Sequence, residues 1–129
     1  MGGARSGEVA ARDRFASKGS RGAALAVQVE VAVAVTRHYL AGELSILLGQ
    51  LETVTTNRTS AGEVARLRYE AETSPLTALP SVMVRALVLT DGLCWESLAR
   101  ADTATFNRQA TVSAELHDWG VCAGMLDEE

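Results

Sequence analysis

The sequence predicts an all-α protein: a small antiparallel bundle of three long helices and one short helix, preceded by a disordered N-terminal arm. Two stretches, 36–55 and 103–126, repeat apolar residues at spacings of four and three, the stripe of a helix that packs at a shallow angle. A third stretch, 80–101, is apolar around more than one face, as expected of a helix with two or three neighbours. A composition of 47% hydrophobic and 22% charged residues is that of an ordinary globular domain.

The first 35 residues are expected to lie outside the bundle domain, which we place at 36–129. Residues 1–22 are rich in glycine and have little apolar periodicity, which predicts a disordered basic arm. In 23–35, valine occupies every second position from Val27 onward, a pattern typical of a strand. Because no other segment is available to pair with it, we expect 23–35 to be loosely held or to extend the following helix.

The first bundle helix is expected at 37–55. Its predicted stripe consists of Leu40, Leu44, Leu47, Leu51 and Val54. Beside this stripe lies a face of small residues, namely Gly42, Ser45 and Gly49. A glycine inside a helix costs about 1 kcal/mol relative to alanine, so such a face indicates close helix approach or, alternatively, a groove for a ligand.

A short second helix is expected at 61–73. Ser60 and Glu63 have the S-x-x-E spacing of a capping box, in which two side chains satisfy free backbone N–H groups of the first turn. The helix should end at Ser74, because the residue before a proline disfavours helical backbone angles.

The third helix, at 80–101, is predicted to be the central one. Pro80 suits the first turn, because backbone N–H groups there have no hydrogen-bond partner within the helix and the missing N–H of proline therefore costs nothing. Asp91 and Gly92 interrupt the apolar pattern, so the helix is expected to bend or divide there.

The fourth helix, at 103–126, can be capped by Asp102 or Thr103. If it forms an antiparallel hairpin with the third helix, Cys94 and Cys122 are offset by twelve residues, which is on the order of 18 Å along the helix axes. A disulfide requires Cα atoms within roughly 7 Å. We therefore expect two reduced, buried thiols, as in a cytoplasmic protein.

The distribution of charge argues against several classes of partner. Residues 1–22 carry a net charge of +3 and the remainder carries −7, whereas phosphate binding requires a concentrated basic face on the folded part. Nucleic acid is therefore not the expected partner. Eleven of the twelve basic residues are arginine, which suggests GC-rich coding and a bacterial source. The apolar run 23–35 contains Gln28 and Glu30 and is shorter than the roughly twenty residues of a membrane span, so no membrane is expected either.

No arrangement of residues predicts a catalytic centre, a metal site or a cofactor. The two histidines, His38 and His117, lack the E-x-x-H spacing that places a carboxylate and an imidazole on one helical face. Neither Cys94 nor Cys122 lies three or four residues from a histidine that could act as its base. Glycine-rich phosphate loops do not occur.

The leading function predicted from sequence is a cytoplasmic protein-interaction or regulatory role without catalytic activity, with a homodimer as one arrangement. Trp95 falls on the more polar side of its helix and is the first candidate for a partner contact, followed by Arg85 and Tyr39. The first alternative is a small-molecule-binding or enzymatic bundle that uses the groove near Gly42, Ser45 and Gly49. The second is a helix-turn-helix-like DNA-binding regulator built on residues 61–86, although that segment lacks the short glycine-containing turn of such motifs.

Overall fold

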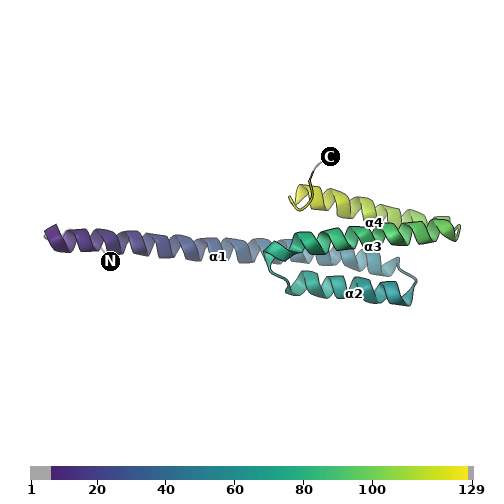
Figure 1. The fold of residues 1–129 in the computed structure, drawn as a ribbon, viewed down its shortest axis with the longest axis horizontal. Helices are drawn as coiled ribbons and strands as arrows, with labels where there is room; N and C mark the ends of the chain where they lie inside the picture. The colour runs from purple at the N-terminus through teal and green to yellow at the C-terminus, as the bar shows by residue number, and fades with distance from the viewer. Residues whose placement is uncertain (1–6, 128–129) are drawn as a thin grey trace. The chain divides into compact units, whose positions relative to one another are not determined.

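The fold is all-α, as the sequence predicts. A computed structural model describes the backbone of residues 7–127 and the side chains of residues 21–127, and within these residues there is no strand. The elements are α1 (Gly7–Thr53), α2 (Arg58–Thr73), a short 3₁₀ turn η1 (Leu76–Ala78), α3 (Leu79–Ala99) and α4 (Thr103–Cys122) (Figure 1).

The chain divides into two units, residues 1–35 and residues 36–129. α1 begins at Gly7, so the arm predicted for residues 1–22 overlaps the helix from Gly7 onward, and its first six residues lie outside the described part of the chain. Residues 23–35 also belong to α1. Within residues 21–35 every side chain is exposed, including Leu25 and the five valines from Val27 to Val35.

The core of the second unit forms where the 36–53 part of α1 meets α2, α3 and α4, which lie alongside it (Figure 1). Its most deeply buried large apolar side chains are Leu44, Leu48, Leu51, Leu79, Met83, Leu116, Val64 and Val82. On α1 the buried stripe is Ala41, Leu44, Leu48 and Leu51, whereas the predicted Leu40, Leu47 and Val54 are only partly buried. The stripe is rotated because α1 contacts helices on two sides, α2 through Ser45 and α4 through Glu43.

α2 begins three residues before the predicted start, and its cap is Asn57. The Asn57 Oδ1 accepts hydrogen bonds from the backbone N–H groups of Thr59 (2.9 Å) and Ser60 (3.2 Å). The capping box predicted from Ser60 and Glu63 is therefore wrong, because an asparagine three positions upstream already satisfies the first-turn donors. The predicted end is confirmed: Ser74, before Pro75, has extended backbone angles (φ −78°, ψ 151°).

α3 continues as one helix through Asp91 and Gly92, so of the two predicted possibilities the division is wrong. The neighbouring Thr90 and Leu93 are buried, and their packing on both sides of the dipeptide outweighs the roughly 1 kcal/mol that a helical glycine costs. The Thr90 hydroxyl donates to the Ala86 carbonyl (2.6 Å), so this buried polar group has its hydrogen bond within the helix. Pro80 lies in the first turn, as predicted.

The connection from α3 to α4 uses Ala101 and Asp102. Ala101 has a φ of 56°, in the left-handed region that favours glycine, and this conformation lets the Asp102 N–H donate to the Ser97 carbonyl (2.9 Å). Asp102 caps α4 by accepting from the Thr105 N–H (3.1 Å), which confirms one of the two predicted caps. Hydrogen bonds from the side chain and backbone of Thr105 lower the pKa of Asp102.

After α4 the chain turns back on itself, and Gly120 makes this possible. A Cβ at Gly120 would lie 2.5 Å from Leu126 Cδ1 and 3.2 Å from Met83 Cε, so a larger residue cannot fit without a shift. Both cysteines are free thiols, but the prediction that they are buried is wrong: Cys94 is half-buried and Cys122 is exposed. Burial and the nearby Asp91 carboxylate raise the pKa of Cys94.

Candidate functional site

The most unusual surface of the second unit is the side of α3 that faces away from the core. Val84, Val88 and Trp95 are 47%, 67% and 72% exposed, and Leu98 extends the row at 47%. At about 100° per residue, these four side chains fall within about 40° of the helix direction set by Val84. We call Val84, Val88, Trp95 and Leu98 the outer stripe of α3.

The opposite side of α3 supplies the core. Its buried residues are Leu79, Val82, Met83, Ala86, Thr90, Leu93 and Ser97. A helix that is apolar on opposite sides normally has neighbours on both, but within the described residues α3 is covered only on its core side and flanks. The outer stripe is therefore an exposed surface without a partner in this chain, and it is apolar except for the exposed Asp91, which lies on the same side of α3 between Val88 and Trp95.

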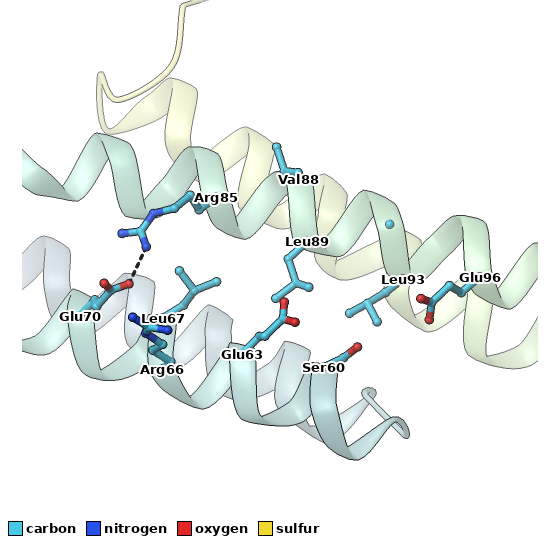
Figure 2. Close-up of a pocket in the computed structure, with 11 residues that line it drawn as sticks. Ser60, Glu63, Arg66, Leu67, Glu70, Arg85, Val88, Leu89, Leu93 and Glu96 are labelled. Carbon is cyan, nitrogen blue, oxygen red and sulfur yellow. Dashed lines mark hydrogen bonds and ion pairs between the residues drawn. The ribbon is translucent and has the colours of Figure 1, made fainter.

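A groove of about 770 Å³ runs between α2 and α3 along one flank of the outer stripe (Figure 2). Leu89 and Leu93 point from α3 toward α2 and form its apolar floor with Leu67, whereas Val88 points away toward the outer side. The rims are charged, with Glu63, Arg66 and Glu70 on α2 and with Arg85 and Glu96 on α3. At one end of the groove, Arg85 reaches across from α3 to α2, and its Nη1 contacts Glu70 Oε2 at 2.8 Å (Figure 2).

A second groove, of about 570 Å³, lies on the other flank between α3 and α4. Trp95 and Leu98 of the outer stripe line it together with Phe106 and Ala110. The polar edge includes Asp91, whose Oδ1 accepts from the Ser113 hydroxyl (3.3 Å), so the carboxylate leans toward α4. The outer stripe is thus a ridge between two grooves.

The structure brings two of the three predicted contact residues onto one helix. Trp95 is the most exposed large apolar side chain of the stripe, and Arg85 lies at its α2 edge. Tyr39 is also exposed, at 64%, but it belongs to α1. The residues that sequence reasoning missed are Val84, Val88 and Leu98. The successive intervals from Val84 to Val88, Trp95 and Leu98 are four, seven and three residues, which place them on one face of a helix. A helix with apolar residues on more than one face does not reveal which of these faces the core uses.

The small-residue face of α1 lies largely against α2. The Ser45 hydroxyl donates to Glu72 Oε1 (2.8 Å), and a Cβ at Gly49 would lie 3.8 Å from the Arg68 guanidinium carbon. The Arg68 Nη1 also contacts Glu52 Oε2 at 3.1 Å. Gly42 has no atom within 4 Å of the position of a Cβ. Ser45 and Gly49 therefore serve the contact between α1 and α2, and Gly42 is apart from it.

Ser97 and Gln109 form a hydrogen-bonded network inside the core. The Ser97 hydroxyl donates to Gln109 Oε1 (2.6 Å), and Gln109 Nε2 donates to the Val54 carbonyl (3.3 Å). These contacts tie together α3, α4 and the segment after α1, which is a structural role. Among residues 21–127 no group of three or more histidine, cysteine or carboxylate side chains could hold a metal ion, and His38 and His117 are both exposed.

By length and composition alone, two helical segments are apolar enough to cross a membrane, Arg21–Thr53 and Leu76–Ala99. The second contains α3, which supplies part of the core. No protein-family profile, curated protein sequence or solved structure shows a significant match to this chain.

Proposed function

We propose that this chain is a cytoplasmic protein-interaction module without catalytic activity, and that it binds its partner through the outer stripe of α3. The observation that carries the proposal is the apolar side of α3 opposite the core, with Val88 and Trp95 about two-thirds exposed or more. Burying apolar surface contributes about 25 cal/mol per Å², so a partner that covers this stripe removes an unfavourable contact with water.

Trp95 has the properties of an energetic anchor for such an interface. Tryptophan is among the residues whose truncation most often costs more than 2 kcal/mol at protein interfaces. Its indole N–H can stay near the polar rim while the ring is buried, and the α3–α4 groove beside it gives a partner side chain a place to enter.

We further infer that residues 36–127 form an antiparallel bundle, which would hold the side chains of the outer stripe in fixed positions. Contacts between α1 and α2 support this direction, because Arg37 Nε donates to the Ser74 carbonyl (2.7 Å) and Glu52 pairs with Arg68. As residue numbers rise along α1, those of its α2 partners fall. The same order holds between α3 and α4, where Asp91 contacts Ser113 and Ser97 contacts Gln109.

The two alternative functions gain no specific support from the described residues. Three arginines of α2, α3 and the turn after α3 face carboxylates within the chain, Arg68 with Glu52, Arg85 with Glu70, and Arg100 with Glu96. Phosphate binding would have to compete with these pairs. The grooves beside α3 lie at the surface, and the buried Ser97 and Gln109 are hydrogen-bonded to each other and to the Val54 carbonyl, so neither feature offers an enclosed polar pocket for a small molecule.

The test is site-specific photo-crosslinking in cells of the source organism. A photoreactive amino acid replaces Val88 in the full chain, and the matched control replaces Ile46 of α1, which is equally exposed (65% against 67%). The proposal expects a discrete crosslinked protein band from position 88 and none from position 46. Equal crosslinking from both positions, or none from position 88, would overturn it.

A further inference from the structure

We propose that the partner on the outer stripe is a second copy of this chain, with the two α3 helices packed antiparallel about a two-fold axis that crosses α3 near Asp91. The inference rests on the proposed function, because it assumes that the outer stripe is a binding surface. It adds the identity of the partner and the geometry of the contact.

The first support is the symmetry of the outer stripe about one point. A two-fold interface uses the same patch on both copies, so the patch must complement itself. Val84 and Leu98 are equidistant from Asp91, and the midpoint of Val88 and Trp95 lies between Asp91 and Gly92. In an antiparallel pair, each Val88 therefore meets the partner's Trp95, and each Val84 meets the partner's Leu98.

The spacing of the stripe also fits a helix pair. Val84, Val88, position 91, Trp95 and Leu98 follow intervals of four, three, four and three. This repeat is the one that keeps two helices in contact over several turns when they cross at a shallow angle of about 20°.

The charges beside the stripe select the antiparallel direction. Arg85 and Glu96 both lie on the α2 edge of α3, and their midpoint falls between Thr90 and Asp91. In an antiparallel pair the same edges of the two helices face each other. Each Arg85, which also contacts Glu70 of its own chain, then lies near the partner's Glu96, which contacts Arg100 of its own chain. A parallel pair would instead place the α2 edge of one helix against the α4 edge of the other, so that Arg85 and Glu96 would not meet across the interface.

Asp91 is the one unfavourable group near the proposed axis. Its hydrogen bond from Ser113 holds the carboxylate toward α4, away from the centre of the stripe, but the two carboxylates of a dimer still approach each other. Removing this charge should therefore strengthen the dimer. We expect Asp91→Asn to lower the dimer dissociation constant several-fold.

Sedimentation velocity of the purified full chain, from micromolar to submillimolar concentrations, tests the dimer. The wild-type chain is expected to change from monomer to dimer, and Val88→Glu and Trp95→Ala are expected to remain monomeric. The matched controls Ile46→Glu and Tyr69→Ala alter side chains that are equally exposed on α1 and α2 (65% and 67%) and should dimerise like the wild type. Because all four positions are exposed, far-UV circular dichroism should show the same helix content for every variant.

Three outcomes would overturn the proposal. The first is a wild-type chain that stays monomeric at the highest concentration. The second is dissociation by Ile46→Glu as complete as that by Val88→Glu. The third is dissociation by Val31→Glu, in the exposed N-terminal part of α1, with no effect of Val88→Glu.

Disulfide trapping tests the orientation. In a background with Cys94→Ser and Cys122→Ser, Asp91→Cys places a thiol near the axis, where two facing Cα atoms approach the range that a disulfide spans. Val88→Cys places the two thiols about 10 Å apart along the helix axes of an antiparallel pair. Crosslinking of Asp91→Cys and not of Val88→Cys is expected. Crosslinking of Val88→Cys as well as Asp91→Cys would mean a parallel pair, and the absence of crosslinking at position 91 would remove the axis; either result would overturn the geometry.

The photo-crosslink from position 88 separates this inference from the proposed function. Crosslinking between two copies of the chain supports both. Crosslinking only to a different protein leaves the proposed function standing and overturns the homodimer. The absence of any crosslink overturns both.

Discussion

Replacement of Gln109 by leucine should destabilise the bundle and should do so through one identifiable network. Gln109 is 2% exposed and Ser97 is fully buried. Gln109 accepts from the Ser97 hydroxyl at 2.6 Å and donates to the Val54 carbonyl at 3.3 Å. A leucine of similar size keeps the volume filled but removes both hydrogen bonds.

The expected cost of Gln109→Leu is about 2 kcal/mol, since each lost hydrogen bond contributes about 1 kcal/mol and the Val54 carbonyl is left without its side-chain donor. For a chain of this size this corresponds to a melting temperature lower by about 8 °C. Ser97→Ala alone should cost about 1 kcal/mol. The double variant should also cost only about 2 kcal/mol, because the bond between Ser97 and Gln109 is lost once and not twice.

Urea unfolding followed by far-UV circular dichroism, at one fixed protein concentration, measures these free energies of unfolding. A coupling energy of about 1 kcal/mol between Ser97 and Gln109 is the result expected from the geometry. Additive effects of the two substitutions, or no loss of stability in Gln109→Leu, would refute the conclusion that this network holds α3 and α4 together.

Five further substitutions test the backbone and the helix ends. Gly120→Ala should lower stability by about 1–3 kcal/mol in urea unfolding, because its Cβ would overlap the side chain packed there, whereas Gly42→Ala, with open space, should raise it by about 0.5–1 kcal/mol. Ala101→Gly should raise the melting temperature, because the left-handed conformation (φ 56°) favours glycine. Asn57→Ala should cost about 1 kcal/mol in the same urea assay by removing the acceptor of two backbone N–H groups. Hydrogen bonding from the first turn of α4 lowers the pKa of Asp102. The ionised Asp102 side chain therefore stabilises the fold fully above the ordinary carboxyl pKa, and this contribution is lost as the pH falls through the lowered pKa. Asp102→Asn should reduce the dependence of the free energy of unfolding on pH in this acidic range.

Helix ends that depend on neighbouring residues in the chain were predictable. The stop at Ser74 follows from the steric effect of Pro75, and the cap at Asp102 follows from a short acceptor side chain before the first helical turn. The start of α2 was not predictable, because two side chains that can cap a helix, Asn57 and Ser60, lie within four positions of each other. Both satisfy the local chemistry, and the geometry of the turn after α1 decides between them.

Features that depend on several helices at once were predicted only in part. The exposure of Trp95 was anticipated from its polar neighbours, but Val84 and Val88 were assigned no contact role, because α3 carries apolar residues on more than one face. The sequence also left open whether α3 divides at Asp91 and Gly92. A local weakness in a helix is outweighed when the residues on either side of it are packed into a core.

Apolar periodicity along the chain was sufficient to establish the all-α class. The assignment of one side of α3 to the core and the other to the surface required the positions of α1, α2 and α4, since burial is a property of all the neighbours together. The outer stripe, on which the proposed function depends, is visible only once the core has taken the opposite side of the helix.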